Sequence, residues 1–139
     1  MWPEFPIEFL AVGTPVSLQS SNRRARDEWK ALVLAAAEAE VGGDSWAFDT
    51  QRLSVTMFYF PQAEMQGDVD NIAKLTIDAL VPRIYLDDSL VDRVLVQRFY
   101  PEHSATFDSP TEKLLEALGS NEPVLFVKID EVQLEEVNT

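Results

Sequence analysis

Residues 67–88, which read GDVDNIAKLTIDALVPRIYLDD, constrain this chain more than any other segment. Apolar residues recur at helical spacing from about residue 71 to residue 80, and this pattern predicts an amphipathic helix. Asp70 is a suitable N-cap at its start, and Pro82 is expected to end it. Lys74 follows Asp70 by one helical turn, so both side chains lie on the same side of the predicted helix.

Two acidic pairs flank this helix: Asp68 with Asp70 before it, and Asp87 with Asp88 after it. Carboxylates on separate elements that converge on one site are suitable ligands for a hard divalent cation such as Mg2+. Such ions promote phosphoryl displacement, and Lys74 could neutralise charge that develops on a phosphate. The structural alternative is an N-cap with a solvated acid, followed by an ordinary turn. The two pairs together with Lys74 favour the metal site.

The order of these residues resembles the RusA family of Holliday-junction resolvases. The resemblance rests on D-V-D-N-I-A-K at 68–74, D-A-L at 78–80, and L-D-D-S followed by V-D at 86–92. It is dense over residues 67–92 and looser over most of the remaining chain.

The resemblance implies a role for four residues. Asp68, Asp70 and Asp88 would bind Mg2+, with Mn2+ as a possible substitute, and Lys74 would assist catalysis. Asp87 occupies the flanking acidic position, and no ligand role is carried over to it. The family further implies a homodimer that cuts branched DNA, since a four-way junction requires two symmetric cuts.

The composition predicts one ordinary globular domain over residues 1–139. The chain has 46% hydrophobic and 10% aromatic residues and no cysteine, which excludes disulfides and thiolate zinc sites. No Gly-rich phosphate loop precedes a helix, so P-loop nucleotide hydrolysis is disfavoured. No apolar run approaches the roughly 18 residues of a membrane span, and no signal pattern opens the chain. We therefore expect a cytoplasmic protein without a membrane partner.

The spacing of apolar residues predicts an α+β fold with a mixed sheet of about four strands and two main helices. The first main helix is expected at about residues 23–40, with Trp29, Leu32, Val33 and Ala36 buried. A short acidic helix is expected at 110–118, and a frayed acidic tail from about residue 131. The strands are expected at 7–12, 53–60, 90–100 and 124–129.

Basic residues cluster at the start of the first main helix. The predicted DNA-binding residues are Asn22, Arg23, Arg24, Arg26 and Lys30. Bases at a helix N-terminus oppose the helix dipole, so an anion such as a DNA phosphate could compensate them. A solvated first turn is an equally good interpretation of the same cluster.

The net charge of −13 is opposite in sign to that of most proteins that approach DNA phosphates. Residues 101–139 carry nine acids and two bases, so they hold about half of this excess. Three functions from two classes, enzymes and binding modules, therefore remain. The first is a Mg2+-dependent endodeoxyribonuclease acting on branched DNA. The alternatives are an acidic RusA-like binding module without nuclease activity, and a Mg2+ phosphoesterase acting on another nucleic acid.

Overall fold

The computed structural model describes residues 1–16, 20–62, 69–102 and 106–132, and of residues 69–71 only the backbone. The elements are β1 (Ile7–Val12), α1 (Arg23–Val41), β2 (Leu53–Phe60), α2 (Val69–Ala79), a 3-10 helix η1 (Asp88–Leu90), β3 (Val91–Arg98), α3 (Glu112–Leu118) and β4 (Val124–Glu131).

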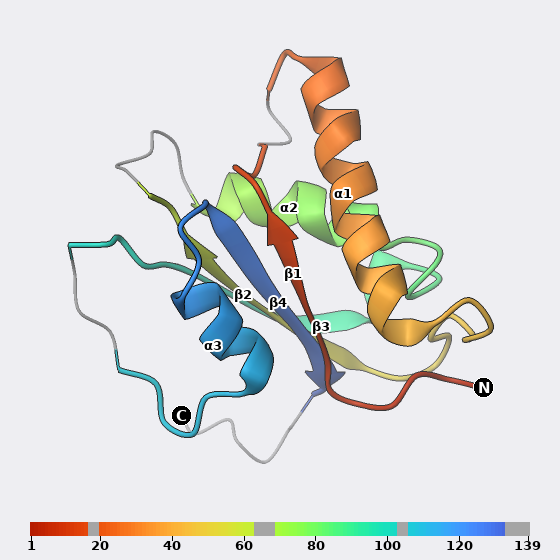
Figure 1. Cartoon of the computed structure of the whole chain (residues 1–139). Coiled ribbons are helices and arrows are strands. Elements are labelled where there is room, and N and C mark those ends of the chain that lie inside the picture. Colours follow the sequence, from red (N-terminus) through yellow and green to blue (C-terminus); the bar gives the residue numbers. More distant parts are fainter. Residues whose placement is uncertain (17–19, 63–68, 103–105, 133–139) are drawn as a thin grey trace, which may run out of the picture.

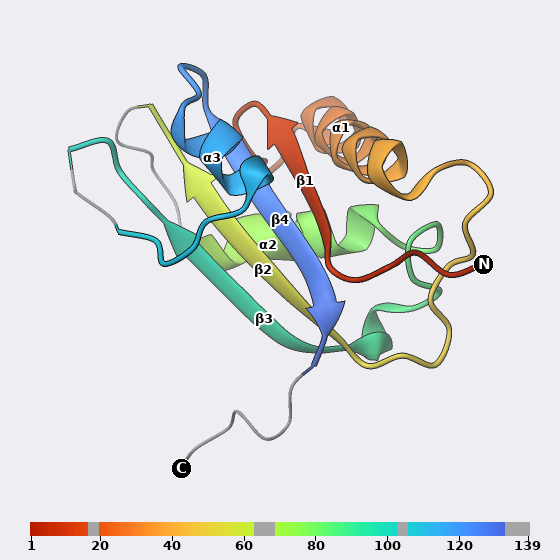
Figure 2. The same ribbon diagram turned by 60° about the horizontal axis from the view of Figure 1, so that its bottom comes forward.

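The four strands form one mixed sheet in the order β1-β4-β2-β3. β4 lies between β1 and β2 and is antiparallel to both, whereas β3 is parallel to β2 at the edge. The helices α1 and α2 cover one face of the sheet, and α3 lies on the other (Figures 1 and 2). The α+β class and the four-stranded mixed sheet are confirmed, with α3 as the short third helix.

Local interactions fix both ends of α1. The side-chain oxygen of Asn22 accepts a hydrogen bond from the Ala25 amide at 3.0 Å, which caps the N-terminus. At the other end the Gly42 amide donates to the Glu38 carbonyl at 3.0 Å. Gly42 has φ = 81°, a backbone conformation that favours glycine and so ends the helix.

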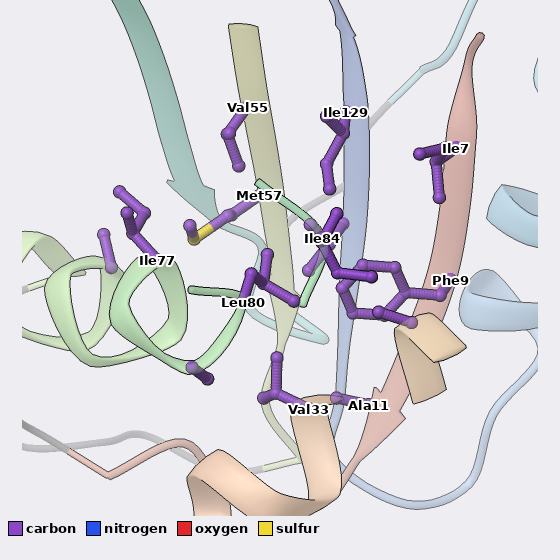
Figure 3. Packing of buried hydrophobic residues seen from close by; sticks show 14 of the residues in the cluster. Ile7, Phe9, Ala11, Val33, Val55, Met57, Ile77, Leu80, Ile84 and Ile129 are labelled. Carbon is purple, nitrogen blue, oxygen red and sulfur yellow. The ribbon is translucent and has the colours of Figure 1, made fainter. Parts of the chain in front are cut away.

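The main core fills the space between the sheet and the two long helices. Figure 3 shows Phe9 of β1, Met57 of β2, Ile129 of β4 and Val33 of α1 in one cluster, with Leu80 and Ile84 between the upper strand residues and Val33. The strand residues that point toward α3 alternate with these and form a second, smaller cluster of aromatic and aliphatic side chains. Leu80, which follows α2, is fully buried in the main core.

Several local predictions differ from the structure. Leu32 is 39% exposed, because α1 buries the stripe Trp29, Val33 and Ala37 and leaves Leu32 on its flank. Asp70 is not the N-cap of α2, because the helix already begins at Val69.

The predicted strand at 90–100 is shorter than expected. Leu90 belongs to η1, and β3 spans only Val91–Arg98.

At residue 131, where a frayed acidic tail was expected to begin, the chain still belongs to the sheet. Glu131 closes β4, and the Val132 amide donates to the Arg52 carbonyl at 3.1 Å. The rest of that prediction, residues 133–139, lies outside the described residues. Over the described ranges, no helix combines the length and apolarity needed to cross a membrane.

Candidate active site

Lys74 and Asp88 come together although they are 14 residues apart in the chain. Lys74 Nζ lies 3.0 Å from Asp88 Oδ2, and the two side chains are 49% and 45% exposed. Lys74 projects from α2, whereas Asp88 begins the 3-10 helix that precedes β3. α2 lies in the connection between the parallel strands β2 and β3. The chain passes close to α2 again at Asp88, just before β3 begins.

The segment between α2 and β3 is anchored by buried side chains and by hydrogen bonds to Ile77 and Phe48. Ile84 and Tyr85 are essentially fully buried, and burial of side chains of this size stabilises by about 1.5–3 kcal/mol each. The Tyr85 hydroxyl donates to the Ile77 carbonyl at 2.7 Å. The Phe48 amide donates to the Ile84 carbonyl at 2.9 Å, and the Leu86 amide donates to the Phe48 carbonyl at 3.0 Å. These contacts fix the path that leads to Asp88.

Asp87 has a structural task at the start of η1. Its Oδ1 accepts a hydrogen bond from the Ser89 amide at 2.9 Å, so it is the N-cap of this turn. That hydrogen bond is the main reason why the pKa of Asp87 is below its ordinary value. Asp87 therefore caps the turn, whereas the carboxylate of the next residue, Asp88, contacts Lys74.

Arg52, which the sequence interpretation did not single out, holds the segment that follows Asp88. Its guanidinium forms a bidentate ion pair with Asp92 and also donates to the Ser89 carbonyl at 2.7 Å. The hydrogen bond from Arg52 lowers the pKa of Asp92. No local signal could identify this pair, because the partners are 40 residues apart in the chain.

Asp78 is a second carboxylate on Lys74. Its Oδ1 lies 3.0 Å from Lys74 Nζ, one turn further along α2. The hydrogen bonds to Asp78, and next to Asp88, raise the pKa of Lys74 above its ordinary value. The sequence interpretation quoted Asp78 only as part of the D-A-L pattern, although its spacing of four residues from Lys74 already places the two side chains together.

Tyr85 lies beneath these carboxylates. Its burial raises the pKa of the phenol well above the ordinary value, and the negative charges of Asp78 and Asp88 raise it further. The phenol therefore stays neutral and remains the hydrogen-bond donor to the Ile77 carbonyl.

The structure brings together only part of the predicted site. Asp68 lies outside the described residues, and of Asp70 only the backbone is described, in the first turn of α2. Asp70 precedes Lys74 by one helical turn, and residues at this spacing share a face of a helix.

The predicted DNA-binding residues lie on α1. Asn22 caps this helix, and Arg23 and Arg24 have side chains that are 87% and 90% exposed. Arg23 pairs with Asp27 at 3.9 Å, and Arg24 pairs with Glu28 at 2.9 Å. These acids reduce the positive potential of the first turn.

Arg26 and Lys30 are half-buried on the same helix. α1 packs against the flank of α2 that carries Thr76, whose hydroxyl accepts a hydrogen bond from the Trp29 indole at 3.1 Å. Lys74 is two positions from Thr76, about 200° around the helix, and therefore faces away from α1. Figure 2 shows α2 with α1 along one side and β3 toward the other.

The donor set suits a hard cation, since carboxylate oxygens are the ligands that Mg2+ prefers. Within the described ranges, however, no group of three or more His, Cys, Asp or Glu side chains is arranged to hold a metal. The donors expected from the sequence include Asp68 and Asp70, whose side chains are outside those ranges. Among the expected ligands, Asp88 alone has a described side chain.

Comparison with protein families gives one match. The model for the family described as endodeoxyribonuclease RusA matches residues 15–107. No curated protein matches the chain. The matched segment runs from before α1 to beyond β3, and so it includes both helices of the main core and the Lys74–Asp88 contact.

Proposed function

The chain belongs to the RusA family of endodeoxyribonucleases, and on this premise we propose that it hydrolyses phosphodiester bonds in branched DNA with the help of Mg2+. The observation that carries the proposal is the contact between Lys74 and Asp88, at 3.0 Å, inside the matched segment. Both side chains are about half exposed to solvent, so Lys74 is accessible to a phosphate group while Asp88 holds it.

Asp68, Asp70 and Asp88 would hold the Mg2+ ion, and Mn2+ could replace it. A divalent ion bound there would activate water and stabilise negative charge on the phosphate. The residues of the chain supply the rest. The turn at Asp87 and the Arg52–Asp92 pair hold Asp88 in place. Lys74 would donate a hydrogen bond to a non-bridging phosphate oxygen as charge develops on it.

The reaction itself is a displacement at phosphorus. A water oxygen bonds to phosphorus and gives up one proton, the bond to one bridging oxygen breaks, and the leaving oxygen gains one proton, so that the step balances overall. Lys74 is protonated at neutral pH because the ordinary pKa of lysine is about 10.4, and the hydrogen bond to Asp78 raises the pKa of Lys74 further. Its role in the proposal is therefore electrostatic.

A second functional class is favoured by the charges on α1. Asp27 and Glu28 pair with the two most exposed arginines of the expected DNA surface, and the chain has a net charge of −13. Such a surface also suits an acidic RusA-like module that binds a basic partner and does not cut DNA. The remaining alternative, a Mg2+ phosphoesterase on another nucleic acid, would use the same acidic residues.

A cleavage assay separates these candidates. Synthetic four-way junctions, matched linear duplexes and a single-stranded RNA are incubated with the protein in Mg2+ or in a chelator. The proposal requires cleavage of the junction that is absent without Mg2+ and weaker on the linear duplex. Asp70→Asn should abolish it in a protein that remains folded. Absence of cleavage and of binding at low salt would contradict the nuclease proposal, and preferential cleavage of RNA would favour the phosphoesterase.

We also propose that the active form is a homodimer, because symmetric cuts in a junction require two identical sites. Light scattering coupled to size exclusion gives the mass of the particle directly. A mass equal to one chain, 15.7 kDa, under conditions in which junctions are cut would contradict the dimer.

A further inference from the structure

Lys74 has two carboxylate partners of different origin. Asp78 Oδ1 and Asp88 Oδ2 both lie 3.0 Å from Lys74 Nζ. Asp78 stands on the same helix as Lys74, whereas Asp88 stands on a separate turn after a connecting segment. The ammonium group has three donors, so it can keep both carboxylates and still offer one hydrogen bond to a third group.

The stability of α2 gives no reason for an acid at position 78. α2 ends at Ala79, so Asp78 lies in the last turn, where the helix dipole disfavours negative charge. A lysine followed by an acid four residues later is also the less favourable order of such a pair. A half-exposed pair of this kind contributes little to stability, because solvent screens the two charges. The contact with Lys74 is what distinguishes this position.

A lysine without fixed partners is a poor electrostatic catalyst. Its long side chain has many rotamers, and this freedom must be lost when the ammonium group meets a phosphate. Asp78 is the less exposed of the two partners, with 31% of its side chain accessible against 45% for Asp88. It therefore limits the directions in which Lys74 can extend from α2.

We infer that Asp78 is a positioning residue that holds the Lys74 ammonium group toward the substrate phosphate, an inference that rests on the proposed nuclease function. Asp88 cannot fill this role alone, because the proposed cation would compete with Lys74 for its oxygens. Asp78 is attached to the same rigid helix as Lys74 and keeps its contact independently of the turn that carries Asp88.

The test compares Asp78→Asn and Asp78→Glu with a matched control, Glu40→Gln. Glu40 of α1 accepts a hydrogen bond from Lys113 of α3 at 2.8 Å. The control therefore also replaces a carboxylate that pairs with a lysine. Junction cleavage in Mg2+ is measured as kcat and KM. For Asp78→Asn we expect kcat to fall about 10- to 100-fold with KM unchanged, because phosphate binding survives while Lys74 loses its orientation. Asp78→Glu, which keeps a carboxylate, should recover part of the loss, and Glu40→Gln should show none.

A second readout does not depend on activity. The four lysines give few ammonium signals in 15N NMR spectra recorded at low temperature, and Lys74→Arg identifies the signal of Lys74. Asp78→Asn should shift or broaden that signal and leave the one from Lys113 unchanged, whereas Glu40→Gln should do the reverse. An unchanged Lys74 signal in Asp78→Asn would overturn the inference.

The kinetic outcomes separate this inference from the function on which it rests. If the wild type cuts junctions and Asp78→Asn cuts them with the same kcat, the role of Asp78 is refuted and the nuclease function stands. A rise in KM at constant kcat in Asp78→Asn would also refute this role, since Asp78 would then affect only binding. If the wild type cuts no substrate, the proposed function fails first and the inference fails with it.

Discussion

The indole of Trp29 donates a hydrogen bond to the hydroxyl of Thr76 at 3.1 Å, across 47 residues of sequence. Both side chains are buried, and Thr76 in turn donates to the Ile72 carbonyl at 3.3 Å. This contact joins α1 to α2 and fixes the rotation of α2 about its axis. It thereby directs Lys74, on the opposite side of α2, away from α1.

The first prediction concerns this contact. Thr76→Val keeps the shape of the side chain but leaves the Trp29 indole without an acceptor, so we expect a loss of about 1–3 kcal/mol of unfolding free energy. Urea denaturation measures it, with the exposed Thr50 changed to Val as the control. The loss should be smaller in a Trp29→Phe background, because no donor is then left unpaired. Additive losses in the double variant would argue against an energetic link between the two residues.

The neighbouring acids Asp87 and Asp88 should respond very differently to the same substitution. Asp88→Asn removes charge at the proposed metal site, so we expect junction cleavage to fall by about 100-fold or more while the protein remains folded. Asp87→Asn keeps an oxygen that can accept from the Ser89 amide, so cleavage should change little. Initial cleavage rates in Mg2+ provide the comparison. Equal losses in the two variants would assign both acids to the structure of the turn.

The paired charges on α1 predict opposite effects of two double variants on DNA binding. Arg23→Glu with Arg24→Glu should abolish junction binding, whereas Asp27→Asn with Glu28→Gln should strengthen it by removing the acids that pair with the arginines. Each phosphate contact contributes a slope of about −0.9 to the logarithmic salt dependence of the binding constant. Gel-shift titrations at two salt concentrations give both the affinity for the junction and its salt dependence.

The control for these variants is Lys128→Gln on β4, which is expected to leave the affinity unchanged. Lys128 alternates with the buried Val127 and Ile129, so its side chain points to the face of the sheet away from α1. If both α1 variants bind junctions as the wild type does, α1 is not the DNA surface.

The ion pair between Arg52 and Asp92 predicts a pH dependence of stability. The guanidinium lowers the pKa of Asp92 in the folded protein, so the folded state binds the proton of this group less readily than the unfolded state. The pair therefore contributes its full stabilisation above the ordinary aspartate pKa of about 3.9, and the contribution is lost as the pH falls through the folded value.

Thermal unfolding between pH 7 and pH 3 tests this prediction. Asp92→Asn should lower the midpoint at pH 7 and lose less than the wild type on acidification. Parallel curves for the two proteins would show that Asp92 does not contribute to the acid sensitivity.

The local elements could be predicted from the order of the residues. The apolar spacing gave the helix that buries Trp29 and Val33, and Asn22 gave its start, because helix hydrogen bonds and caps join residues only a few positions apart. Strand alternation likewise identified β2, whose residues face the core in turn. The pairing of Lys74 with Asp78 was also determined locally, since four residues of helix bring them together.

The contacts between distant residues could not be predicted in this way. The insertion of β4 between β1 and β2 depends on which apolar faces pack together, and no local hydrogen bond records that choice. The same packing exposed Leu32 and brought Asp88 to Lys74 through the buried segment around Tyr85. It also paired Arg52 with Asp92. These contacts result from the packing of distant segments against the main core, and no single segment specifies them.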